Sequence, residues 1–469
     1  MTINDAKNLI RDTVKIYLAK NKYGEYIIPF MKQRPIYMVG APGIGKTAII
    51  EQVAKEFNIP VVSFSMTHLT IDNAIGVPVI RKIAFADHYY DVAEYTVSEI
   101  IASVYHVVFD SKKDEGILFL DEINCVSDSL APLMLLFLQY KKFGNKQLPP
   151  GWVIVTAGNP PEYNKSVQEF DLATMDRLKY ISVEPDLGTW MMYARRHNVH
   201  GAISAFLESH QDMFYSAKNT ENGQEYVTAR GWEDLSQTLQ LYEMTNLPVS
   251  LVLIQQYITD RTISKLFFEF YLKYEQYKSQ NSHMALFSQS EHQPLCDMSL
   301  YEDKLAIINQ ALTIIAEQLI SWKYLDEMDD YLRNILNTIS QSFSNYRRIN
   351  LAGYFEQEIN NIKQTLEREE KGHTLTEDTK HIYMDIIEVL QYWNDHYSDI
   401  RANEPRDLIY TMKNDATRRT EGLDGLKEKI KKEVSNTKDF ICTKWGDETL
   451  NFYMTGLKDL KYINEVLES

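Results

Sequence analysis

The octapeptide GAPGIGKT at residues 40–47 constrains the fold of this chain more than any other feature. It fits the pattern G-x-x-x-x-G-K-[ST]. An apolar run at residues 36–39 precedes it and an amphipathic stretch at residues 47–57 follows it, which predict a strand and a helix. A strand, a glycine-rich loop and a helix in that order form a phosphate-binding loop. The motif therefore predicts an α/β domain that binds phosphate groups.

Each residue type in this loop has a physical reason. The glycines let the backbone curl, so that successive N–H groups converge on phosphate oxygens at the positive end of the helix. Lys46 is expected to place its ammonium between the β- and γ-phosphates, and the Thr47 hydroxyl to bind Mg²⁺. The expected nucleotide-binding residues of the loop are Gly40, Ala41, Pro42, Gly43, Ile44, Gly45, Lys46, Thr47 and Ala48.

A second motif, GILFLDEIN at residues 116–124, is an apolar strand that ends in two carboxylates. Asp121 is expected to bind the nucleotide's Mg²⁺, together with Thr47, and Glu122 to polarise the attacking water. Two solvated acids at the end of a strand are the simpler explanation of this run alone. The phosphate-binding loop upstream favours the catalytic role of Asp121 and Glu122.

Short apolar runs, separated by turn residues and helical stretches, continue from Arg34 to Val183. This pattern is typical of βαβ units and a parallel sheet. We therefore expect a three-layer α/β core with helices on both faces of the sheet. The expected strands are residues 36–39, 61–65, 117–120, 153–157 and 181–183.

Helical patterns replace the strands after Glu184. Residues 190–196 and 250–277 predict helices of a smaller domain, and the polar residues 279–294 predict a linker. Beyond it, apolar residues recur every three or four positions, which predicts a helical bundle or arm. These stripes lie at residues 305–339, 383–400 and 450–467.

The sequence thus predicts three parts. They are an α/β nucleotide-binding core at residues 1–184, a helical domain at residues 185–285 and an acidic helical region at residues 286–469. The last part holds 33 Asp and Glu residues against 22 Lys and Arg residues, so it carries most of the chain's net charge of -16.

This acidity makes nucleic acid an unlikely main ligand, because that affinity comes largely from Lys and Arg at phosphates. The three cysteines are far apart and form no CxxC pair, so neither a disulfide framework nor a zinc site is expected. We find no signal-peptide pattern at the first residues and no run near the roughly 20 apolar residues that cross a bilayer. We expect a soluble, cytoplasmic protein without a membrane segment.

The pairing of GAPGIGKT with LFLDEIN resembles the nucleotide motifs of AAA+ ATPases. The runs VIVTAGNPPEY at residues 153–163 and FDLATMDRL at residues 170–178 are similar to the MoxR branch of that superfamily. The resemblance covers residues 1–285. It implies a P-loop AAA+ core, a helical lid domain formed by residues 185–285, and ATP and Mg²⁺ as cofactors.

The resemblance also implies roles for two residues of the core. Asn159 matches the sensor-1 residue, which helps to orient the water or contacts the γ-phosphate; the alternative is a simple turn residue at the end of a strand. Arg177 matches the arginine finger, which reaches the nucleotide of a neighbouring subunit and so implies a ring, as a homo-hexamer in the family. Its alternative is a surface salt bridge with Asp176.

Arg230 matches the sensor-2 arginine at the start of a lid helix, where it would contact the γ-phosphate in cis, and Thr228 is a candidate N-cap there. The alternative is an ordinary arginine at the start of a helix. Arg195 and Arg196 are weaker candidates for this role, because they lie in a stretch that we expect to be an exposed helix.

Two further stretches match insertions of the MoxR branch. Residues 69–95 lie where the family inserts a hairpin into the second core helix, and residues 143–152 lie where a hairpin precedes the sensor-1 strand. In the family both face the central pore or the substrate side. As bare sequence they are loops with turn residues.

The resemblance implies an ATPase that couples Mg²⁺-dependent hydrolysis to the remodelling of a protein partner, often one with a von Willebrand factor A domain. Two alternatives stay open. One is a nucleotide-dependent oligomeric scaffold with little turnover, and the other is a DNA-acting AAA+ motor. The Asp121-Glu122 pair argues against the first, and the net charge against the second.

Overall fold

The computed structural model describes residues 1–85, 88–144, 146–163, 167, 170–220, 223–280, 282–288, 298–345, 351–371, 375–397 and 405–468. The chain divides into two compact units, which are described separately. The first consists of Met1–Asp186 with Gln364–Thr376, and the second of Leu187–Lys363 with Glu377–Ser469.

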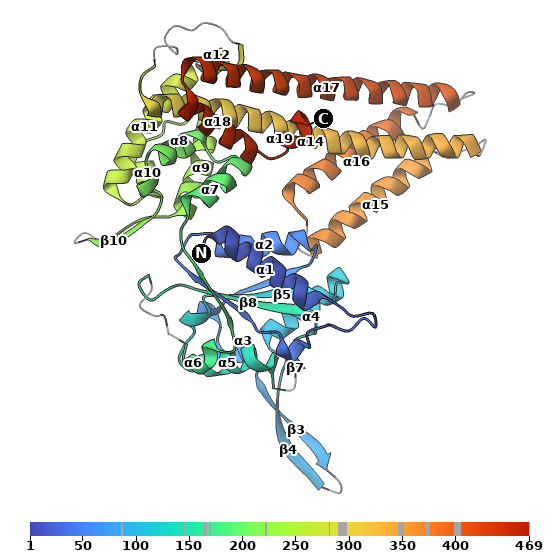
Figure 1. The fold of residues 1–469 in the computed structure, drawn as a ribbon. Helices are drawn as coiled ribbons and strands as arrows, with labels where there is room; N and C mark the ends of the chain where they lie inside the picture. Colours follow the sequence, from blue (N-terminus) through green and yellow to red (C-terminus); the bar gives the residue numbers. More distant parts are fainter. Residues whose placement is uncertain are drawn as a thin grey trace. The chain divides into compact units, whose positions relative to one another are not determined.

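A five-stranded parallel sheet forms the middle of the first unit (Figure 1). Its strands follow the order β2-β5-β8-β1-β9. The five predicted strands are confirmed, each within two residues at either end. Because the strands are parallel, the carboxyl ends of the neighbours β5, β8 and β1 lie at one edge of the sheet. The bounds are β1 (Ile36–Gly40), β2 (Val61–Ser65), β5 (Gly116–Asp121), β8 (Trp152–Gly158) and β9 (Lys179–Val183).

Helices on both faces complete the predicted three-layer α/β core. The alternate residues Leu118 and Leu120 of β5 share a buried cluster with Val104 of α4 and Phe137 of α5. Successive side chains of a strand point to opposite faces, so the other buried residues of β5 face the side of α2, which contacts this strand. The helices are α1 (Ile3–Leu18), α2 (Lys46–Glu56), α3 (Ile71–Ile75), α4 (Glu99–Ser111), α5 (Ala131–Tyr140) and α6 (Leu172–Met175), with 3₁₀ turns η1 (Phe30–Lys32), η2 (Met66–His68) and η3 (Ile123–Cys125).

Two antiparallel hairpins lie at the positions of the expected insertions. The hairpin of β3 (Pro78–Phe85) and β4 (His88–Tyr95) separates α3 from α4 and extends beyond the layers of the first unit (Figure 1). The short pair β6 (Lys142–Phe143) and β7 (Lys146–Gln147) precedes β8. Exposed apolar side chains on the longer hairpin include Ile80 and Tyr89.

The second unit begins with helices that match the expected helical domain. An aromatic cluster of Phe206, Trp232 and Phe267 joins three of them, with ring centroids 5.3–5.9 Å apart. The predicted helix at 250–277 is interrupted, because Asp260 caps a new helix with hydrogen bonds from the backbone of Thr262 and Ile263. The elements are α7 (Leu187–Arg196), α8 (Gly201–Ser209), η4 (Gln211–Met213), β10 (Ser216–Thr220), β11 (Gly223–Val227), α9 (Ala229–Met244), α10 (Leu251–Gln255) and α11 (Arg261–Ser279).

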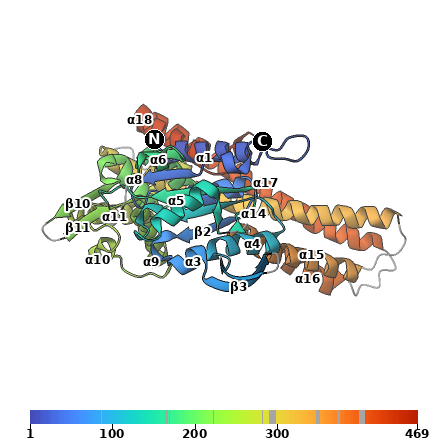
Figure 2. The same cartoon turned by 90° about the horizontal axis from the view of Figure 1, so that it is seen from below.

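Long helices form the rest of the second unit. α14 (Tyr301–Asn345) and α17 (Pro405–Lys444) lie side by side and antiparallel, as contacts of Asp329 with Arg419 and of Trp322 with Lys427 show (Figures 1 and 2). The predicted stripes therefore fall on helices, although position 400 lies outside the described residues. The remaining helices are α12 (Ser282–Ser288), α15 (Leu351–Lys371), α16 (Glu377–Tyr397), α18 (Asp447–Asp459) and α19 (Ile463–Leu467); the part of α15 from Gln364 onward belongs to the first unit.

The expected linker at residues 279–294 is partly helical. α12 lies within it, and its Leu286 and Phe287 are buried in a cluster with residues of α14, α17 and α18. Residues 281 and 289–294 lie outside the described part of the chain. Both expected parts, residues 185–285 and residues 286–469, contribute residues to the second compact unit. The division into three domains stays a prediction.

α14 also contains the one stretch, among the described residues, that is long and apolar enough to cross a membrane. The sequence analysis expected none. Within Tyr301–Gln341, 67% of the most apolar window is buried inside the protein. Leu305, Ile308 and Ile315 belong to the core shared with α17 and α18, so this apolar character is accounted for by internal packing.

The expectation that residues 195 and 196 lie on an exposed helix is wrong for Arg195. Its side chain is 7% exposed, and its Nη1 lies 2.7 Å from Oδ2 of Asp459. The guanidinium also lies over the ring of Phe452, 5.4 Å from the centroid. Helix α18 covers it, and this contact joins positions 264 residues apart. Arg196 is exposed.

Candidate nucleotide-binding site

The glycine-rich loop connects β1 to α2, as predicted. Gly45 caps α2 with a φ of 91°, in the left-handed region that favours glycine. A Cβ at Gly40 would lie 2.7 Å from the backbone oxygen of Val183, so only glycine fits beside β9. Lys46, Thr47 and Ala48 form the first turn of α2, the end of a helix at which the backbone N–H groups point outward. This end of α2 therefore attracts anions.

The other loop residues contribute backbone and packing. Ala41 and Ile44 are buried, whereas Pro42 and Ala48 are partly buried. Gly43 has a φ of 71°. The loop thus has the backbone conformation that its sequence predicts, and its two buried side chains anchor it to the core.

Lys46 joins the loop to the neighbouring strand. It is only 9% exposed, and its Nζ donates to the backbone oxygens of Gly40 and Ala41 at 2.8 and 2.9 Å. A third bond, of 2.8 Å, goes to Oδ1 of Asn159. A buried ammonium has three protons to satisfy, and these contacts satisfy all three. The sequence-predicted residues Lys46 and Asn159 therefore lie together.

Thr47, in the first turn of α2, and Asp121, at the end of β5, also lie together. The Thr47 hydroxyl donates to Oδ2 of Asp121 at 3.3 Å. Magnesium is usually held by one or two protein oxygens together with phosphate oxygens and water. A hydroxyl and a carboxylate beside an anion-binding helix end fit this donor set, so both residues could hold Mg²⁺ with a nucleotide.

Glu122 has a strained backbone, and hydrogen bonds fix its side chain. Its φ of 57° places a non-glycine residue in the left-handed region, which is found more often at functional sites. Its Oε2 accepts hydrogen bonds from the hydroxyls of Ser65 and Thr67, both 3.2 Å long. Ser65 ends β2, the strand beside β5, and Thr67 follows in η2. The sequence analysis missed these hydroxyls, because nothing local marks them.

Asn124 is a second residue that the sequence analysis missed. It is 2% exposed, and its Nδ2 donates to the backbone oxygen of Asn159 at 2.8 Å. A Cβ at Gly158 would lie 2.4 Å from Oδ1 of Asn124, so this glycine makes room for the amide. Asn124 thus fixes the backbone at Asn159. Its position two residues after Glu122 was the available signal.

Arg177 lies near the amino-terminal ends of the strands, opposite the carboxyl ends where the glycine loop lies. It is exposed and precedes β9, whose first residue Lys179 pairs with Ile36 at the start of β1. The glycine loop leaves the opposite end of β1, about 13 Å away for four residue steps of 3.3 Å. Within the described residues no ion pair joins Arg177 to Asp176; Arg177 donates to the backbone oxygen of Ala173 at 3.3 Å. The structure does not bring it to the loop of its own chain.

Arg230 belongs to the second unit. It lies in the first turn of α9 and is exposed. Thr228 is the N-cap of this helix, as the sequence suggests, and accepts a 3.0 Å hydrogen bond from the backbone of Gly231. The local setting is therefore the predicted one. Its role toward a nucleotide stays a prediction.

A buried polar cluster lies elsewhere in the second unit. His200, Glu243 and Glu275 bring possible metal-ligand atoms within 4.8 Å of one another. However, Nδ1 of His200 accepts the backbone N–H of Ala202, so Nε2 carries the proton and donates to Glu243 at 2.8 Å. Lys278 forms ion pairs with both carboxylates. The cluster is therefore an ion-pair network rather than a set of free metal ligands.

This network makes a prediction for stability. Burial alone would raise the pKa of Glu243, but hydrogen bonds from His200 and Lys278 and the positive charge of Lys278 hold that pKa well below 4.5. Below about pH 4.5 the carboxyl group of Glu243 takes up a proton in the unfolded chain but not in the folded protein. The free energy of unfolding therefore decreases as the pH is lowered. Glu243→Gln should lower the free energy of unfolding by about 2 kcal/mol near neutral pH.

Urea unfolding from pH 7 to pH 3 measures both effects. The loss of stability on acidification should be smaller in Glu243→Gln than in the wild type. Glu269→Gln, on the exposed face of α11, is the matched control and should behave as the wild type does. An unchanged pH dependence in Glu243→Gln would contradict the assignment.

Comparison with known proteins agrees with the site in the first unit. Residues 36–174 match the family model of the ATPase family associated with various cellular activities (AAA). No curated protein matches the chain at a significant level. The matched segment runs from β1 to α6 and contains the glycine loop, the acidic pair and Asn159. Residues 36–174 are therefore similar to AAA ATPases, and this similarity supports an AAA+ ATPase in general.

Proposed function

We propose that this protein is a MoxR-like AAA+ ATPase that couples Mg²⁺-dependent ATP hydrolysis to the remodelling or maturation of a protein partner. One observation supports this most. Lys46, Thr47, Asp121, Glu122 and Asn159 converge at the carboxyl edge of one parallel sheet. Ligands of open α/β sheets bind at this edge.

In this proposal the chain's own groups act on the γ-phosphate. Lys46 turns from Asn159 toward the phosphates and neutralises their charge, and Asn159 then helps to orient the water. Thr47 and Asp121 would hold Mg²⁺, which would supply charge neutralisation at the phosphates. Glu122 accepts a hydrogen bond from the attacking water, and Ser65 and Thr67 position its carboxylate.

The two arginines complete the proposed site in different ways. Arg230 would contact the γ-phosphate in the same chain. Arg177 would be supplied by the neighbouring subunit of a homo-hexameric ring, because it lies at the edge of the sheet opposite the loop of its own chain. Among the described residues no ion pair joins it to Asp176, the pairing that was the alternative, and its Nη1 donates to the backbone oxygen of Ala173.

A short path links Glu122 to the proposed partner side. Thr67, which holds Glu122, lies in η2, and η2 leads directly into α3 and the β3–β4 hairpin. The exposed Ile80 and Tyr89 of this hairpin suit contact with a polypeptide. The partner is a protein client, in our proposal one with a von Willebrand factor A domain. The expected cytoplasmic location stays a prediction.

The test is Mg²⁺-dependent turnover and assembly of the purified chain. We expect steady-state release of phosphate from ATP that stops when EDTA removes the metal, and a shift from monomer toward hexamer in mass photometry on adding ATP. Lys46→Ala should abolish both by removing the phosphate contact. Nucleotide binding with no turnover in any condition would contradict the proposal and favour the scaffold. Stimulation of turnover by DNA would favour the motor.

A further inference from the structure

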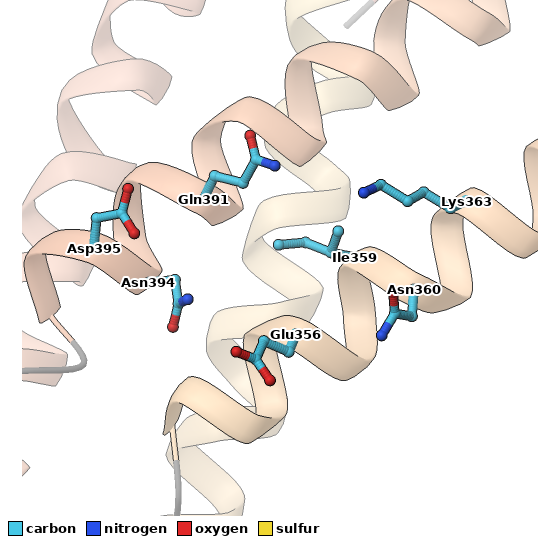
Figure 3. Close-up of a pocket in the computed structure, with 7 residues that line it drawn as sticks. All are labelled: Glu356, Ile359, Asn360, Lys363, Gln391, Asn394 and Asp395. Carbon is cyan, nitrogen blue, oxygen red and sulfur yellow. The ribbon is translucent and has the colours of Figure 1, made fainter.

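A polar groove lies between α15 and α16 in the second unit (Figure 3). Its cavity volume is about 510 Å³. On the α15 side it is lined by Glu356, Asn360 and Lys363, which recur every three or four residues and so share one face of the helix. Ile359 is 7% exposed and lies between the two helices. Many ligand sites in proteins have volumes of this order.

The α16 side supplies Gln391, Asn394 and Asp395. Packed helices normally bury apolar residues between them or pair their polar groups. Here, in the part of the chain that the structure describes, Oδ1 of Asn394 is buried without a hydrogen-bond partner. Among the described residues, no ion pair or hydrogen bond joins the lining side chains of α15 to those of α16. The groove thus has hydrogen-bonding capacity that the fold leaves unused.

The charges in the groove are separated. Glu356, Asn394 and Asp395 lie toward one end and Lys363 toward the other (Figure 3). Asp395 lies in the last turn of α16, where the helix dipole adds negative potential. Residues 351–397 hold ten Asp and Glu residues against four Lys and Arg residues. Charge complementarity therefore favours an occupant that brings positive side chains to the carboxylate end.

We propose that this groove binds a basic, extended segment of the partner protein. Lys or Arg side chains of the segment pair with Glu356 and Asp395. The amide groups of Asn360, Gln391 and Asn394 donate to and accept from its backbone, as side-chain amides can do both. This inference rests on the proposed function, since it supplies a docking site for the protein partner.

The test uses the full chain and two fluorescein-labelled decapeptides, one of alternating Lys and Gln and one of alternating Glu and Gln. Fluorescence anisotropy should show binding of the basic peptide and none of the acidic one. The double variant Glu356→Lys with Asp395→Lys should weaken the basic peptide at least tenfold. Lys363→Glu should strengthen it, because it removes the one cation of the groove.

The matched control is Glu421→Lys with Asp424→Lys, which makes the same charge change on the exposed face of α17. It should change peptide affinity less than twofold. If both double variants bind the basic peptide equally weakly, the attraction comes from the overall acidity of the protein and the proposal is overturned. Absence of peptide binding to the wild type would also overturn it. Circular dichroism and thermal unfolding check that both variants fold.

The outcome is separable from that of the proposed ATPase, because peptide binding is measured without nucleotide. ATP hydrolysis without groove binding would overturn the groove alone. Groove binding without hydrolysis would leave the docking site and overturn the enzyme.

Discussion

Glu122→Gln is expected to lower kcat for ATP hydrolysis by about 10²- to 10⁴-fold, the range of general-base catalysis. The substitution keeps the shape of the side chain and its capacity to accept from Ser65 and Thr67, but it removes the negative charge that polarises water. Lys46, Thr47 and Asp121 stay in place, so ATP affinity should change less than about threefold. Phosphate release and binding of a fluorescent ATP analogue measure the two quantities.

The matched control is Glu51→Gln, on the exposed face of α2. It makes the same chemical change a few residues from the loop and should leave both quantities unchanged. Turnover by Glu122→Gln within a factor of three of the wild type would exclude Glu122 as the catalytic base. Loss of ATP binding in the same variant would show instead that its charge serves assembly of the site.

The strands and the loop of the core were predictable because their signals are local. Buried parallel strands are continuous apolar runs, and the run at Gly116–Asp121 ends at the residues that meet the glycine loop. The position of Asn159 next to the acidic pair followed from the order of strands that the resemblance implies. The pairing of β5 with β8 agrees with it.

The contacts that the sequence analysis missed join residues far apart in the chain. Ser65 and Thr67 reach Glu122 across 57 and 55 positions, because β2 pairs with β5. Arg195 is buried only because Phe452 and Asp459 come from the opposite end of the unit's sequence. Helical periodicity near Arg195 describes one helix and contains no information on a covering helix.

The helical region illustrates a different limit. The polar stretch after Ser279 has the composition of a linker, but Leu286 and Phe287 find a buried cluster and stabilise a short helix there. The apolar stripe at residues 305–339 does not by itself show whether it forms one helix or two. Packing along α17 accounts for a single helix of 45 residues.

Arg177→Ala is expected to lower kcat by about 10²-fold or more, since arginine fingers contribute about 10³- to 10⁵-fold in GTPases. The residue is exposed and lies at the edge of the sheet opposite the loop, so the loss should arise in the neighbouring subunit's site. ATP affinity of the isolated chain should stay unchanged. Arg11→Ala, at an arginine of the first unit whose side chain is 42% exposed, is the control and should retain full turnover.

Mixing the two inactive variants tests action in trans. An Arg177→Ala subunit keeps its own Glu122, and beside a Glu122→Gln subunit it receives that neighbour's Arg177. Its site then has every proposed catalytic group, so an equimolar mixture should hydrolyse ATP although neither variant does so alone. Activity should depend on the mixing ratio and reach a maximum at intermediate ratios. If Arg177 acts in its own chain, every site in the mixture lacks one group, and no ratio restores turnover.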